Sequence, residues 1–138
     1  MDADKKLSWG DRRAAASAER KRLKSVRGKP VAVFFPFTLY SEGWVEKATG
    51  DDRGCFSLEG ATVELGSGSE LESRFTAARF VMLGVFALAF KKKRGGEQFL
   101  AFLGDDFQWL EEVPRKKVGA ATKFFHQVRG VQQKKGWL

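Results

Sequence analysis

Two residue types that often act in catalysis occur once each in this chain, as His126 and Cys55. A zinc or hydrolytic site needs several ligands or an oriented base, and a thiol nucleophile needs a base beside it. One histidine and one distant cysteine do not form that pattern. We therefore expect His126 to be a half-exposed helix residue and Cys55 a small, partly buried one. No enzyme activity, metal site or cofactor is predicted.

Adjacent carboxylates are the other candidates for acid–base chemistry. Asp51-Asp52 and Asp105-Asp106 stand next to glycines in segments typical of turns. Glu111 and Glu112 lie on an expected strand, where neighbouring side chains point to opposite faces. Residues 66–69 (GSGS) lack the lysine and the strand–loop–helix context of a phosphate-binding loop. None of these sets of residues indicates a catalytic site.

The densest positive charge is a run of four cations, Lys91, Lys92, Lys93 and Arg94. A Gly-Gly pair follows and favours a tight reversal, so we expect these cations at a hairpin tip. The positive electrostatic field of these four cations favours the binding of anions, and each well-placed cation contributes about 1 kcal/mol to binding at an anionic membrane surface. A solvated tip that discourages edge-to-edge aggregation is the alternative.

A second basic group lies near the N-terminus and comprises Arg12, Arg13, Arg20, Lys21, Arg22, Lys24, Arg27 and Lys29. At 100° per residue these cations spread around a helix, and few large apolar residues oppose them, which disfavours a membrane-surface helix. Nucleic acid is a reasonable partner for such an arm. Most phenylalanines hold core-like positions, which leaves Trp9, Trp44 and Trp137 as uncommitted aromatic residues for base stacking.

The arm itself is predicted to be helical over residues 12–26, where alanine, glutamate, lysine and arginine dominate. Asp11 is a candidate N-cap or first-turn anion, and Gly28 with Pro30 ends the helix. Its apolar content is too thin for a core helix, so we expect a detached arm that gains order on a partner. Residues 1–11 are expected to be largely disordered.

The phenylalanine-rich centre is predicted to be a meander of about five antiparallel strands. Its apolar runs have strand length and lack the polar gaps of an exposed helix. The expected strands are 62–65, 74–82, 84–90, 98–103 and 107–113, with a loop at 66–70 and a reversal at 104–106. Residues 31–35 add a short strand, which Pro36 restricts to an edge or strand end. Segments 38–40 and 43–46 have weaker strand character, and 49–54 is a loop.

A helical period follows Pro114. Val118, Ala121, Phe125 and Val128 recur at steps of three and four, and an overlapping row contains Phe124, Val128 and Val131. This pattern predicts an amphipathic helix of about four turns that covers the sheet, fraying near Gly130.

The whole-chain composition indicates one domain with tails. The chain has 138 residues, 43% hydrophobic, with 13 phenylalanines, which is enough for one core. No apolar run reaches 18 residues, no secretory signal is visible, and a single cysteine favours a reduced, cytosolic setting. The net charge of +8 divides into +6 for residues 1–29, −4 for 30–90 and +6 for 91–138.

Residues 54–131 follow a familiar order: a TVE strand, T-x-x-R, G-x-F-A-x-A, a lysine run, a strand that ends in acidic residues, and a helix containing K-F-F. The matching residues are Thr76, Arg79, Gly84, Phe86, Ala87, Ala89, Lys91, Lys92, Lys93, Phe107, Glu112, Lys123 and Phe124. This pattern resembles small bacterial domains of pleckstrin-homology-like fold, common in actinobacteria. The resemblance implies two packed, strongly bent antiparallel sheets with a C-terminal helix capping the barrel. Such folds generally bind lipid headgroups, peptides or proteins and rarely catalyse.

The expected fold is therefore a mostly-β (α+β), pleckstrin-homology-like barrel at residues 30–132, with a basic arm at 1–29 and a tail at 133–138. The expected function is a non-catalytic, protein- or peptide-binding adaptor. The alternatives are an anionic phospholipid surface bound through the basic hairpin and nonspecific nucleic-acid binding through the arm. We expect a cytoplasmic protein, in the lipid case peripheral at the membrane.

Overall fold

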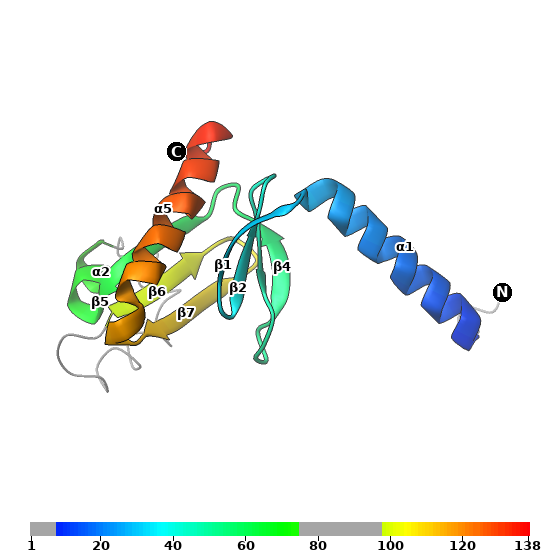
Figure 1. Cartoon of the computed structure of the whole chain (residues 1–138), viewed down its shortest axis with the longest axis horizontal. Helices are drawn as coiled ribbons and strands as arrows, with labels where there is room; N and C mark the ends of the chain where they lie inside the picture. Colours follow the sequence, from blue (N-terminus) through cyan, green and yellow to red (C-terminus); the bar gives the residue numbers. More distant parts are fainter. Residues whose placement is uncertain (1–7, 75–97) are drawn as a thin grey trace.

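The computed structural model describes residues 8–74 and 98–138, which form two antiparallel sheets preceded and followed by a long helix (Figure 1). The elements in chain order are α1 (Trp9–Arg27), β1 (Pro30–Phe34), β2 (Phe37–Tyr40), β3 (Trp44–Lys47), β4 (Gly54–Ser57), β5 (Thr62–Ser67), α2 (Gly68–Arg74), β6 (Gln98–Leu103), β7 (Gln108–Val113), η1 (Arg115–Lys117) and α5 (Val118–Lys134).

Helix α1 projects from the body, and none of its residues is buried (Figure 1). Ser8 is its N-cap, because the Ser8 hydroxyl accepts a hydrogen bond from the Asp11 backbone N–H at 3.1 Å. Asp11 is therefore a first-turn anion. Gly28 ends the helix at φ 80, as expected. The predicted helix is confirmed with longer bounds. The expected disorder is wrong for Ser8 to Asp11, and residues 1–7 lie outside the described part.

Strands β1 to β4 form one sheet in sequence order, so β1 and β4 are its edges. The register places Phe37 opposite Phe34 and Val45 opposite Leu39. These four side chains are buried in the main core. The predicted strand at residues 31–35 is confirmed at an edge, and the two weaker strand predictions correspond to β2 and β3.

Strands β5, β6 and β7 form the second sheet, with β6 in the centre. Leu100 and Phe102 belong to the main core, whereas Phe99, Ala101 and Leu103 pack with Leu71 of α2 on the other face. Because β6 is covered on both faces, its sequence lacks the alternation of a half-exposed strand. The strands predicted at 98–103 and 107–113 and the reversal at 104–106 are confirmed.

The predicted loop at residues 66–70 is wrong. β5 continues to Ser67, and α2 begins at Gly68. The Ser67 hydroxyl accepts a hydrogen bond from the Glu70 backbone N–H at 3.2 Å, which is the geometry of a helix N-cap. Leu71 is fully buried. Capping and burial therefore outweigh the loop-like composition of this segment.

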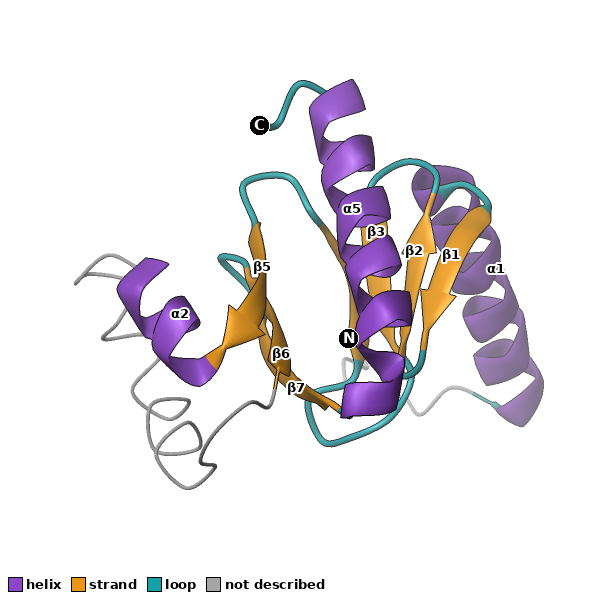
Figure 2. Ribbon diagram, turned by 60° about the vertical axis from the view of Figure 1, so that its left-hand side comes forward, coloured by secondary structure: helices purple, strands orange, loops and turns teal. Residues whose placement is uncertain are grey.

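Helix α5 lies across both sheets and packs against β1, β5 and β6 (Figure 2). Its buried side chains are Ala121, Phe124, Val128 and Gln132. The amphipathic helix is confirmed, but it runs through Gly130 to Lys134, so the expected fraying near Gly130 is wrong. A glycine costs only about 1 kcal/mol inside a helix, which tertiary packing offsets.

The described strands do not close into a barrel, which corrects that part of the prediction. The two sheets are joined by side chains instead. The Phe37 ring lies 4.8 Å from that of Phe102 and 5.6 Å from that of Trp109. Trp109 Nε1 also donates to the Asp52 carbonyl oxygen at 2.8 Å. The strands predicted at 74–82 and 84–90 and the hairpin at 91–96 fall outside the described residues.

Candidate functional site

Three exposed apolar side chains gather at one edge of the molecule. Of the six large apolar residues that are exposed in the described part, three are Val31, Val33 and Phe35, which are 49%, 70% and 72% exposed. Ala32 and Phe34 pack on the core, so strand alternation turns Val33 away from it. Edge strands usually carry charge or proline where they could pair with another chain. β1 has only Pro30 at its start and no charged residue.

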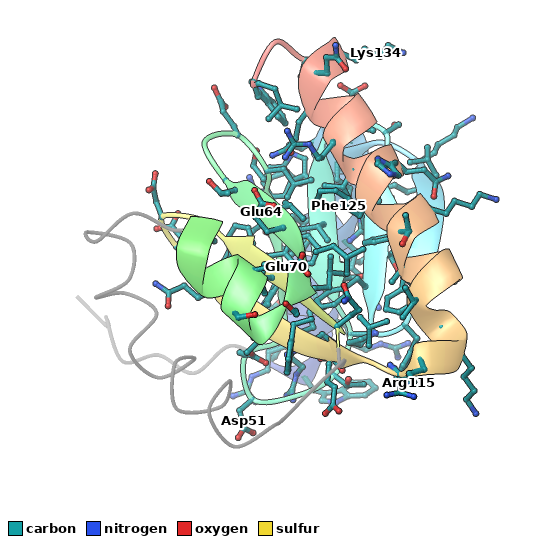
Figure 3. The ribbon with its side chains drawn as sticks, turned by 90° about the vertical axis from the view of Figure 1, so that its left-hand side faces the viewer. Asp51, Glu64, Glu70, Arg115, Phe125 and Lys134 are labelled. Carbon is teal, nitrogen blue, oxygen red and sulfur yellow. The ribbon has the colours of Figure 1, made fainter. Side chains whose placement is uncertain are left out.

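A groove lies beside this edge strand. Its volume is about 300 Å³, and it is lined by Val31, Leu39 and Ser41 of the first sheet and by Gln127, Gly130, Val131 and Lys134 of α5. Gly130 has no side chain, and the space where a Cβ would lie is open, so no side chain of α5 fills the groove at this position. In Figure 3, Lys134 stands at the far end of α5 from Arg115, with Phe125 between them. The groove therefore has an apolar part formed by Val31, Leu39 and Val131, polar side chains at Ser41 and Gln127, and a positive charge at Lys134.

A second hollow of about 490 Å³ lies at the turns that follow β4 and β6. Three aromatic rings line it, those of Trp44, Phe56 and Phe107, together with the carboxylates of Glu59, Asp105 and Asp106. Phe56 and Phe107 stack on each other at 4.8 Å, so much of their ring surface is already covered.

The end of α1 is joined to the sheet by a polar cluster that the sequence did not predict. The Arg27 guanidinium lies 4.2 Å from the centre of the Tyr40 ring. Arg27 Nη1 lies 3.4 Å from a Glu46 oxygen and 3.8 Å from Cys55 Sγ. The Tyr40 hydroxyl donates to the other Glu46 oxygen at 2.9 Å. The cluster thus holds the last turn of α1 against β2, β3 and β4.

This environment raises the pKa values of two side chains in the cluster, those of Tyr40 and Cys55. Burial, and then the hydrogen bond to Glu46, raises the pKa of Tyr40 to about 12. Burial also raises the pKa of Cys55, although the Arg27 hydrogen bond opposes that effect. A thiol with a raised pKa is a weak nucleophile. The half-buried Cys55 matches the prediction for that residue.

In the described part of the chain, His126 and Cys55 form no contact with each other. It lines a separate hollow on α5 with Arg129, Gly130, Gln133 and Leu138. Among residues 8–74 and 98–138, no three histidine, cysteine, aspartate or glutamate side chains gather in a way that could hold a metal ion. The Asp52 carboxylate instead pairs with Lys47 at 2.7 Å.

Six of the eight arm cations, which are candidate contacts for an anionic or protein partner, are all exposed on α1: Arg12, Arg13, Arg20, Lys21, Arg22 and Lys24. The Arg13 guanidinium lies 4.8 Å from the centre of the Trp9 ring. Of the three uncommitted tryptophans, Trp137 packs on the core and Trp44 lines the hollow between the turns, so only Trp9 of these three is exposed, at 72%. Lys91, Lys92, Lys93 and Arg94 lie outside the described residues.

Sequence reasoning missed the apolar edge, the groove and the Arg27 cluster. A signal for the edge was present, since Val31, Val33 and Phe35 alternate with core residues and cannot share their face. For α2 the signal was Ser67-x-x-Glu70, the spacing of a capping box. The Arg27 cluster has no local signal, because its members come from α1, β2, β3 and β4.

Comparison of the chain with protein-family models, with curated proteins and with solved structures gives no match. Within the described segments, no helix combines the length and apolar character needed to cross a membrane.

Proposed function

We propose that this chain is a non-catalytic interaction module of pleckstrin-homology-like fold that binds an extended segment of a partner protein along β1. The observation that carries the proposal is an edge strand with two exposed valines, Val31 and Val33, and no charged residue, followed directly by the exposed Phe35. The fold assignment is supported by four strands in one sheet, three in the other and a terminal helix across both. This arrangement agrees with the two packed sheets and C-terminal helix that the resemblance implies.

The binding mode is strand addition. An edge strand has backbone N–H and C=O groups that face outward, and a bound segment pairs with them while alternate side chains provide specificity. One side chain of the segment enters the groove between Val31 and Val131. Others lie over Val33 and Phe35. Lys134 at the groove end favours a segment with an acidic residue there.

Selection of peptides on the immobilised protein tests this function. The expected result is peptides with apolar residues at alternate positions, whose binding shifts amide NMR signals of β1 and of the α5 residues at the groove. Val33→Lys is expected to abolish binding without unfolding the protein, because Val33 is exposed. Val26→Lys, a matched change of an exposed valine on α1, is the control. Peptides that bind the Val33→Lys protein as tightly as the wild type would exclude strand addition at β1.

The lipid alternative depends on Lys91, Lys92, Lys93 and Arg94, which lie outside the described residues, so it remains a prediction. Its test is flotation with phosphatidylserine-containing vesicles, comparing the wild type with a protein in which all four cations are changed to glutamate. Absence of flotation at low salt would eliminate it. A cytoplasmic location, peripheral at the membrane if lipid binds, is likewise part of the proposal.

A further inference from the structure

Although the arm cations as a whole spread around α1, three of them lie on one face of the helix. Arg13, Arg20 and Lys24 follow one another at steps of seven and four, which places them on one face. Arg12 and Lys21 border this face on either side. We call these five residues the arm stripe. From Arg12 to Lys24 the stripe extends for about 18 Å at 1.5 Å per residue.

Ion pairs support the distinction between the arm stripe and the opposite side of α1. Arg22, on the opposite side of α1 from the stripe, pairs with Glu19 at 2.7 Å. Among the described residues, Arg22 and Arg27 are the arm cations of α1 with a carboxylate partner, and the stripe residues have none. Within residues 8–74 and 98–138, the stripe is therefore a row of positive charge without carboxylate partners on an exposed helix.

The base of the arm is held in place. Arg27 contacts Tyr40, Glu46 and Cys55. The Glu42 backbone N–H donates to the Arg27 carbonyl oxygen at 3.0 Å, so the turn after β2 also binds the helix end. Gly28, at φ 80, has no room for a Cβ beside the Ser41 hydroxyl. The stripe is thus presented in a defined direction, which lowers the entropy lost when it binds.

We propose that α1 binds the phosphate backbone of duplex DNA, without sequence preference, through the arm stripe. An α-helix, about 10–12 Å in diameter, fits the major groove of B-form DNA. Charge complementarity with phosphates is the main attraction. Membrane binding is disfavoured because the side opposite the stripe carries Ala15, Ala18 and the charged Arg22, with Val26 as its one large apolar residue. An acidic protein surface is disfavoured because α1 lacks the apolar centre of a protein interface.

The test is binding of a labelled mixed-sequence DNA duplex to the full chain as a function of salt concentration. Each phosphate contact contributes about 0.9 to the slope of log affinity against log salt. Arg20→Gln with Lys24→Gln is expected to make the slope shallower by about 1.8. The control variant is Lys116→Gln with Lys117→Gln, which removes two exposed cations of η1 and so changes the net charge by the same amount. In this control, the slope of log affinity against log salt is expected to keep most of its wild-type value. Circular dichroism checks that both variants stay folded.

Three results would overturn the proposal. One is no binding of the wild-type chain to the duplex at low salt. A second is an equal loss of slope in the η1 variant, which would mean that net charge alone drives binding. The third is that phosphatidylserine–phosphatidylcholine vesicles, and not DNA, bind in a manner that depends on Arg20 and Lys24. This proposal is independent of strand addition at β1, because Val33→Lys leaves the arm stripe intact.

Discussion

At the scale of single residues, a few buried polar atoms connect segments that are distant in the sequence. The Gln132 side chain of α5 donates from Nε2 to the carbonyl oxygens of Leu58 and Ala61 at 3.2 and 3.0 Å. At the base of α1, Glu46 likewise accepts hydrogen bonds from Arg27, which is 19 residues away, and from its neighbour Tyr40. Buried polar groups of this kind stabilise a fold only while their partners remain in place, because an unpaired group costs about 1–3 kcal/mol.

Replacement of Gln132 by glutamate tests the first of these connections. The change keeps the shape but turns a donor into a carboxylate that faces two carbonyl oxygens. We expect the free energy of unfolding at neutral pH to fall by about 3 kcal/mol. Urea denaturation measures it. Gln133→Glu, on an exposed neighbour, is the control. Equal stability of the two variants would contradict the buried role of Gln132.

Tyr40 provides a pH prediction, because it is the only tyrosine in the chain. An ultraviolet absorbance titration therefore reports this hydroxyl alone. We expect a midpoint at about pH 12 in the folded protein, against an ordinary value of 10.0. The folded pKa is the higher one, so Tyr40 stabilises the fold fully below pH 10 and loses that contribution as the pH rises towards 12.

Glu46→Gln separates the two causes of that shift. The Tyr40 midpoint is expected to move down, because the negative acceptor is removed, while burial still keeps it above 10. A midpoint at the ordinary value in the wild-type protein would contradict the Tyr40–Glu46 contact.

At the scale of elements, two helices of similar length, 19 residues in α1 and 17 in α5, have different roles. α1 has no buried residue, whereas α5 buries Ala121, Phe124, Val128 and Gln132. An isolated helix of this length is marginal in water, so α1 depends on its caps and on the Arg27 contacts. Most of the stability of α5 comes from the sheets beneath it.

A pair of alanine-to-glycine changes distinguishes the two helices. Ala18→Gly in α1 is expected to reduce the helical circular dichroism signal, while the urea midpoint of global unfolding stays the same. Ala121→Gly in α5 is expected to lower the free energy of unfolding by about 1–2 kcal/mol, since it adds a small cavity to the intrinsic cost of glycine. A lowered global midpoint for Ala18→Gly would show that α1 is part of the cooperative core.

At the scale of the whole molecule, the two sheets share one aromatic core. Trp109 of β7 lies within 6 Å of the rings of Phe37, Phe56, Phe102 and Phe107. It is 1% exposed. Phe37 and Phe56 belong to the first sheet, and Phe102 to the second. The sheets are therefore expected to unfold together, although no ladder of hydrogen bonds joins their described strands.

Trp109→Ala tests this dependence. We expect a loss of about 4 kcal/mol in the free energy of unfolding, the usual cost of removing a large buried aromatic side chain. Circular dichroism and the fluorescence of the remaining tryptophans should give one coincident urea transition in the wild-type protein. Two separate transitions would mean that each sheet folds alone.

Prediction from the sequence was correct for elements whose hydrophobic pattern lies within one short segment of the chain. The α5 period, the strands at 98–103 and 107–113, and the proline-limited edge at 31–35 were all found this way. It failed where long-range burial decides. Residues 66–70 have the composition of a loop, but Leu71 fills the outer face of β6 and makes α2 a helix. The row through Phe124 is buried more deeply than Phe125, which depends on where the sheets lie and not on the period.

The sequence by itself determined a β-rich chain with an amphipathic C-terminal helix and a basic N-terminal helix, because composition and periodicity express these properties locally. Only the tertiary structure decided that the described strands form two separate sheets, that β1 leaves its valines in solvent beside α5, and that Arg27 holds the arm. These features depend on contacts between elements far apart in the chain, and no short segment encodes them.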